Sequence, residues 1–190
     1  MVLTSVVFWV VVAVLVFWAL GAYNRLVGLR AQVLRALQAV AVQWQSNGQA
    51  LRHTLSELSH SPETDSAWAS LGDEAASWRP LAVATKQFQA CIAGVLAKPH
   101  LLPAVDDMAS ISAAHEVMHA AWQRLDSEHD DLTGSAVPQT LAVQWQHQGM
   151  LAAEKLRDYH NAAQIYNAAI KQFPAQLLAW IFSFHTAQPL

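Results

Sequence analysis

The fold of this protein is decided by its first 22 residues, MVLTSVVFWVVVAVLVFWALGA (1–22). Thr4 and Ser5 are the only polar side chains in this stretch, which carries no charge. About 20 apolar residues in a helix are enough to cross the hydrocarbon core of a bilayer. We therefore predict that residues 1–22 form a transmembrane anchor. A cleaved signal peptide is the alternative, but it normally has a basic start and a shorter apolar core.

Charges beside the apolar stretch predict its orientation. No lysine or arginine precedes it, whereas four arginines follow it before the first acidic residue, Glu57: Arg25, Arg30, Arg35 and Arg52. Basic residues concentrate on the cytoplasmic side of membrane spans. We expect the amino terminus outside the cell and the rest of the chain in the cytoplasm, at the inner membrane.

The composition of the remaining chain excludes several classes of protein. The net charge is only −3, and no run of lysine or arginine forms a basic stripe, so we expect no nucleic-acid binding. Cys91 is the single cysteine, which excludes an intramolecular disulfide. The sequence contains no glycine-rich phosphate loop and no G-x-S-x-G. We expect no cofactor.

Apolar residues recur every three or four positions through most of the remaining chain, and no stretch alternates apolar and polar residues as a half-buried strand would. The fold class is therefore predicted to be all-α, an N-terminal transmembrane helix followed by an antiparallel up-and-down four-helix bundle or coiled coil. The apolar stripes run from the span to Leu58, from Trp68 to Val95, from Ile111 to Leu125 and from Leu156 to Leu177.

Breaks between the stripes contain proline, glycine and serine, at 59–62, 98–103 and 133–138. Pro80 is expected to kink the second helix or to mark its true start, because proline cannot donate to the preceding turn. The predicted domains are the anchor (1–22), the bundle (23–174) and an apolar C-terminal segment (175–190).

The C-terminal segment should return to the membrane, because four antiparallel helices bring the chain back to the end from which it left. Its stretch LLAWIFSF (177–184) has no charge. Two interpretations are open: the segment caps the end of the bundle, or it lies in the lipid headgroups.

Two parts of the chain resemble the LemA family. YNRLVGLR (23–30) and the later Val42-Gln43 are similar to the opening of that family's first helix, and residues 152–184 are similar to its last helix. The residues that carry the resemblance are Tyr23, Asn24, Leu26, Val27, Leu29, Arg30, Val42, Gln43, Tyr159, Asn161, Tyr166, Asn167, Phe173 and Pro174.

This resemblance implies a single-pass membrane protein with a four-helix cytoplasmic bundle, and it implies no reaction. The chain departs from the family in WQSNGQ (44–49), where basic residues are usual. Asn24 and Asn167 are expected to face each other, since the first and last helices are antiparallel. Phe173-Pro174 should end the last helix, because a residue before proline disfavours the α conformation.

One motif indicates a metal site. His115-Glu116-Val117-Met118-His119 is a literal H-E-x-x-H, in which two histidines on one helix face bind zinc and the glutamate acts as general base. The extended motif fails, because Trp122 and Leu125 stand where glycine and histidine are needed. A third ligand would have to come from elsewhere, and Glu154 is one candidate. We expect a fortuitous or structural histidine pair, and keep a membrane-tethered zinc metallopeptidase as the alternative.

The predicted function is non-enzymatic, a scaffold or adaptor at the inner membrane. Its expected partners are membrane lipid, through the N-terminal span, and protein partners that the sequence does not identify. Outward positions of the first and last helices are rich in glutamine and poor in charge, which suits pairing with other helices. Homo-oligomerisation remains open, although the span contains no G-x-x-x-G. A membrane-shaping role through the anchor and residues 177–184 is a further alternative.

Overall fold

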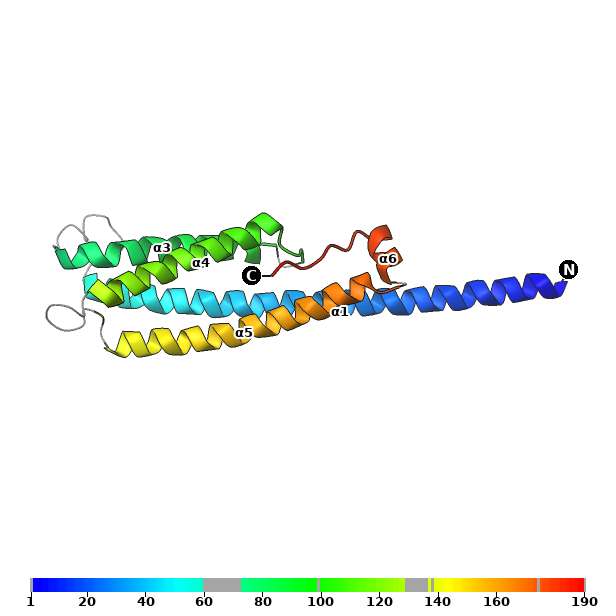
Figure 1. Cartoon of the computed structure of the whole chain (residues 1–190), viewed down its shortest axis with the longest axis horizontal. Coiled ribbons are helices and arrows are strands. Elements are labelled where there is room, and N and C mark those ends of the chain that lie inside the picture. Colours follow the sequence, from blue (N-terminus) through cyan, green and yellow to red (C-terminus); the bar gives the residue numbers. More distant parts are fainter. Residues whose placement is uncertain are drawn as a thin grey trace.

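The computed structural model describes residues 2–59, 73–98, 100–128, 137, 139–173 and 175–189. Within these ranges the chain is all-helical, with five helices and no strand (Figure 1). The helices are α1 (Val2–Ser59), α3 (Asp73–Leu96), α4 (Val105–Glu128), α5 (Gln139–Lys171) and α6 (Ala175–Ile181). The prediction of an all-α chain is confirmed.

Helix α1 is continuous from the apolar stretch into the rest of the protein. It has 58 residues, which corresponds to a length of about 87 Å at 1.5 Å per residue. Its amino-terminal part projects alone, away from the other helices (Figure 1). By length and composition, α1 is the one helix in the described part of the chain that is able to cross a membrane, and its most apolar stretch is not buried against the protein.

The helices pack as two pairs. Helix α1 lies along α5, α3 lies along α4, and α1 also packs against α3 (Figure 1). Helix α4 reaches α1 and α5 through large side chains rather than through close backbone packing. We call the helices α3, α4 and α5, together with α1 from Tyr23 onward, the helical body.

The predicted apolar stripes form the core of the helical body. The buried residues include Val33, Leu37, Val40, Trp44 and Leu51 of α1; Trp78, Leu81, Phe88 and Ile92 of α3; Ile111, Ala114, Met118, Trp122 and Leu125 of α4; and Tyr159, Ala163, Tyr166 and Ile170 of α5. The burial of these residues confirms the stripe in each helix. A 3.6-residue period places such positions on one face of a helix.

The last stripe was predicted too long. Helix α5 ends at Lys171, just before Phe173, so Phe173 and Leu177 leave the core and are 78% and 56% exposed. Pro80 lies inside α3 with an exposed side chain. Of the two alternatives predicted for Pro80, the start of a helix is therefore wrong, and the kink stays a prediction.

Some predicted features fall outside the described residues. They are positions 60–62 of the first break, 68–72 at the start of the second stripe, 133–136 and Pro138 of the third break, and Pro174.

Candidate functional site

Helix α4 places the two histidines of the H-E-x-x-H motif beside the core. Its stripe, which includes Met118, is buried, and His115 lies at the edge of that stripe with a half-buried ring. His119, one turn later, is exposed, and so is Glu116. The two carboxylates of the first turn, Asp106 and Asp107, stabilise the amino terminus of α4 through the helix dipole.

His115 is surrounded by aromatic rings. Its ring centroid lies 5.5 Å from that of Trp44 on α1, 5.3 Å from that of Phe88 on α3, and 5.8 Å from that of His119. Burial lowers the pKa of His115, the neighbouring His119 lowers it further, and Glu116 partly opposes both effects. The imidazole is therefore held in its neutral form at neutral pH.

A pocket of about 290 Å³ opens between α1, α4 and α5, at the two histidines. Among the residues that the structure describes, its lining is mainly aromatic, aliphatic or carboxamide, and contains no aspartate, glutamate, lysine or arginine. The residues that line it include Trp44, Asn47, Gly48, Leu51, Phe88, His115, Met118, His119, Leu141, Gln144, Trp145, Gln148, Gly149, Ala152, Ala153 and Leu156. A pocket of this kind suits a neutral, largely apolar group.

Two tryptophans explain why the pocket exists. The rings of Trp122 on α4 and Trp145 on α5 are stacked, with centroids 4.3 Å apart and planes 8° from parallel. His119 lies beside Trp145 at 6.0 Å. Because these large side chains meet between α4 and α5, the two backbones stay apart and leave space next to the stack.

Carboxamides form one edge of the pocket. The Gln43 amide on α1 donates to Asn47 Oδ1 at 2.9 Å and to Gln148 Oε1 on α5 at 2.8 Å. The Asn47 amide donates to the Gln148 carbonyl at 3.4 Å. These bonds fix the side chains at the α1–α5 boundary without adding charge to the pocket.

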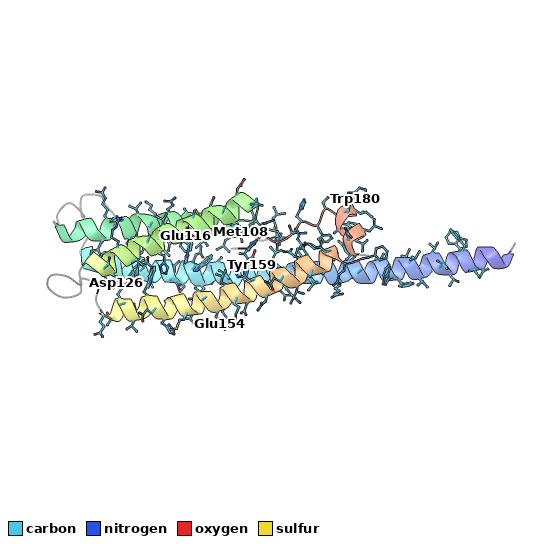
Figure 2. The ribbon with its side chains drawn as sticks, viewed as in Figure 1. Met108, Glu116, Asp126, Glu154, Tyr159 and Trp180 are labelled. Carbon is cyan, nitrogen blue, oxygen red and sulfur yellow. The ribbon has the colours of Figure 1, made fainter. Side chains whose placement is uncertain are left out.

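The zinc interpretation needs a third ligand beside His115 and His119. In the described part of the chain, no three histidine, cysteine, aspartate or glutamate side chains come close enough to hold a metal ion. Glu154, the candidate named above, is exposed on the outer side of α5, and its carboxylate lies 3.9 Å from Lys155 (Figure 2).

Several of the residues that carry the resemblance to the LemA family hold the C-terminal tail, residues 184–189. The Tyr159 hydroxyl donates to the Gln188 carbonyl, and the Tyr166 hydroxyl donates to the His185 carbonyl at 3.1 Å. Asn167 bonds to both backbone groups of Ala187. Burial raises the pKa of Tyr159 to about 12, and it also raises the pKa of Tyr166, where Arg30 opposes it.

We call Tyr159, Tyr166 and Asn167 the tail clamp. The expected pairing of Asn24 with Asn167 is wrong, because Asn24 is exposed and the Asn167 amide is occupied by Ala187. The sequence contained a signal for the clamp: two tyrosines seven residues apart sit in an otherwise apolar stripe, and a buried tyrosine hydroxyl requires a hydrogen-bond partner.

The other motif residues are divided between core and surface. Leu26 is buried and Leu29 partly buried; Val27, Val42 and Asn161 are exposed. The Arg30 guanidinium donates to the His100 carbonyl at 3.4 Å and lies 5.9 Å from the centroid of Phe184. Tyr23 and Phe173 lie at the base of the apolar part of α1, where their rings contact Phe182 and Trp18 respectively.

Comparison with known proteins identifies no relative. No family model matches this chain, and neither a curated protein nor a solved structure matches it.

Proposed function

We propose that this chain is a single-pass membrane protein of the LemA type, in which a cytoplasmic four-helix bundle acts as a non-enzymatic scaffold or adaptor at the inner membrane. The observation that carries the proposal is the pocket between α1, α4 and α5, whose described lining contains no lysine, arginine, aspartate or glutamate. The histidines of this pocket contact aromatic rings, whereas the histidines of a catalytic zinc site have a further metal ligand beside them.

The pocket is suited to receive an uncharged, apolar side chain of a partner protein. Binding hot spots are typically apolar or aromatic anchors that fill a desolvated pocket. A charged group would lose its hydration inside this lining, and no described lysine, arginine, aspartate or glutamate lines the pocket to compensate for that loss. The neutral His115 and the carboxamides of Asn47 and Gln148 supply hydrogen bonds that do not need a charged partner.

Site-specific photo-crosslinking tests this proposal in cells. A photoreactive phenylalanine analogue at Ala153, which lines the pocket, should yield a discrete adduct, whereas the same analogue at Ile165, exposed elsewhere on α5, should not. Gly149 also lines the pocket, and a Cβ there meets no atom within 4 Å. Gly149→Phe should therefore fill the pocket and abolish the adduct.

The matched control is Gly94→Phe, because Gly94 on α3 also has open space around its Cβ and does not line the pocket. It should leave the adduct unchanged. An adduct with twice the mass of the chain identifies a second copy as the partner. Equal adducts in the Gly149→Phe and parent chains would contradict the proposal.

The zinc alternative has its own measurement. Zinc is quantified in the detergent-purified chain beside His115→Ala. Stoichiometric zinc that is lost in the variant, together with peptidase activity that is lost in Glu116→Gln, would replace the scaffold proposal with a membrane-tethered metallopeptidase.

Orientation is tested with a membrane-impermeant maleimide. Cys91→Ala removes the single cysteine, and Val143→Cys introduces one at an exposed position on α5. If the helical body is cytoplasmic, labelling occurs only after the inner membrane is permeabilised. Labelling of intact spheroplasts would reverse the proposed orientation.

A further inference from the structure

Helix α6 has two apolar faces. Ala175, Leu178 and Ala179 are partly or fully buried against the protein, and Ala179 is 5% exposed. The opposite face carries Leu177, Trp180 and Ile181, which are 56%, 81% and 55% exposed. A helix on the surface of a soluble domain normally has charged or polar residues on its outer face. Here that face is covered by no described part of the chain (Figure 2).

Apolar exposure continues on both sides of α6. Phe173 and Phe182, which flank the helix, are 78% and 54% exposed. No charged residue occurs anywhere from Phe173 to Phe184. A contiguous, uncharged group of large apolar side chains usually marks a contact with another molecule or with lipid.

The position of α6 favours lipid. The rings of Phe173 and Trp18 are 5.7 Å apart, and those of Phe182 and Tyr23 are 5.0 Å apart. Trp18 and Tyr23 stand at the end of the apolar stretch of α1, the place where tryptophan and tyrosine concentrate at membrane–water boundaries. Figure 1 shows α6 beside α1 at the point where the helical body ends and the projecting part of α1 begins.

Backbone hydrogen bonds at both ends of α6 fix the helix beside Trp18 and Tyr23. On its amino-terminal side, the Gln176 amide donates to the Gln172 carbonyl at 2.9 Å across the turn from α5. On its carboxyl-terminal side, Ser183 adopts a positive φ of 53°, and the Phe184 amide donates to the Ala179 carbonyl at 2.9 Å. This is the Schellman arrangement that ends helices. The tail clamp then fixes residues 184–189 on α5.

From this placement we infer that α6 lies in the headgroup region of the bilayer that α1 crosses, with Leu177, Trp180 and Ile181 facing lipid. The inference rests on the membrane anchor of the proposed function and adds a second lipid contact to it. It resolves the two interpretations of the C-terminal segment by dividing that segment: residues 184–189 pack on the protein, and α6 packs on lipid. The uncharged outer face suits the interface between headgroups and acyl chains.

Depth-dependent fluorescence quenching tests the inference on the full chain. In the Cys91→Ala background, single cysteines at Trp180, Val10 and Val143 carry an environment-sensitive fluorophore. The protein is reconstituted in vesicles of phosphatidylethanolamine and phosphatidylglycerol that contain a nitroxide either near the headgroup or near the end of the acyl chain. Position 180 should be quenched more by the shallow nitroxide, position 10 more by the deep one, and position 143 by neither.

The three positions separate the possible failures. Quenching at 10, with quenching at 180 no greater than at 143, would overturn the lipid contact of α6 and leave the anchor standing. A blue-shifted but unquenched fluorophore at 180 would show that protein, such as a second copy, covers the surface. Absence of quenching at 10 would remove the anchor and the inference together.

A charge substitution gives a second test, which uses the same fluorophore at position 180. Ile181→Asp should reduce shallow quenching at 180 to the value at 143, because a carboxylate in the interface disfavours insertion. Val143→Asp is the matched control and should not alter it. Unchanged quenching in Ile181→Asp would contradict the inference.

Discussion

Asn167 on α5 binds both backbone groups of Ala187. Its amide nitrogen donates to the Ala187 carbonyl at 2.8 Å, and its Oδ1 accepts from the Ala187 amide, also at 2.8 Å. Ala187 is 4% exposed. A single side chain thus replaces the two hydrogen bonds that a neighbouring strand would make, and this allows an extended tail to lie against a helix without exposing or orphaning its backbone.

Asn167→Ala should release the tail. It leaves the buried amide and carbonyl of Ala187 without partners, at a local cost of about 1–3 kcal/mol for each unsatisfied group. Hydrogen exchange of the Ala187 amide should become faster by one to several orders of magnitude, on the scale of roughly 1.4 kcal/mol per factor of ten. Asn161→Ala, at an exposed position of the same helix, is the control. Equal protection of Ala187 in both variants would refute the role of Asn167.

The two glycines at the pocket should respond differently to alanine. A Cβ at 149 meets open space, so Gly149→Ala should raise the unfolding free energy by about 1 kcal/mol through helix propensity. A Cβ at 48 would overlap the side-chain amide of Gln89 on α3, whose buried nitrogen has no hydrogen-bond partner among the described residues. Gly48→Ala should therefore raise the unfolding free energy by less than Gly149→Ala does. Denaturant unfolding in one fixed detergent compares the two, and a larger gain at 48 would contradict this account.

Acidification should destabilise the helical body through His115. Its pKa is lowered in the folded state, so the unfolded state binds more protons once the pH falls below the ordinary value of 6.5. The stability contributed by the neutral ring is present at higher pH and is lost as the pH falls through that value.

His115→Phe removes this titration and keeps a ring between Trp44 and Phe88, so the midpoint of thermal unfolding should depend less on pH than in the parent chain. His147→Phe exchanges an exposed histidine on α5 and serves as the control. If the midpoint of thermal unfolding depends on pH in the same way in the parent chain and in His115→Phe, the assignment to His115 is wrong.

Ser183→Gly should stabilise the turn after α6. Ser183 has a left-handed conformation, which costs a residue with a Cβ about 1–2 kcal/mol and costs glycine little. Glycine, however, loses more chain entropy on folding. A net gain of about 0.5–1 kcal/mol is expected, seen as slower exchange of the Phe184 amide. Ser183→Ala keeps the Cβ and should give no such gain; if it matches glycine, the backbone argument fails.

The tryptophan stack should couple α4 to α5 energetically. A double-mutant cycle with Trp122→Ala and Trp145→Ala should give an interaction energy of about 0.5–1.5 kcal/mol beyond the two single effects. A second double-mutant cycle, with Trp122→Ala and Trp44→Ala, is the comparison, because Trp44 lies on α1 and is not part of the stack. Additive effects within about 0.3 kcal/mol would show that the stack does not join the helices.

Local pattern was enough to predict much of this fold. The apolar stretch at 1–22, the 3.6-residue stripes up to Ile170 and the end of α5 near Phe173 each depend on neighbours a few residues away, and the structure has them. The H-E-x-x-H motif shows the limit of such reading. Its spacing correctly placed His115 and His119 on one helix, but their surroundings come from Trp44, Phe88 and Trp145, which lie on three other helices.

Tertiary structure alone decided how the helices and the tail meet. Nothing in the local pattern showed that Trp122 and Trp145 stack and hold α4 away from α5, because the two residues are joined by packing and not by sequence distance. The same is true of Asn167, which was expected to face Asn24 and instead holds Ala187. By itself the sequence determined that the chain is helical and which face of each long helix is apolar, since both follow from backbone period and side-chain solubility. Which apolar faces meet, and which face of α6 is left uncovered, depends on how whole side chains fit together, and that was fixed only in the folded chain.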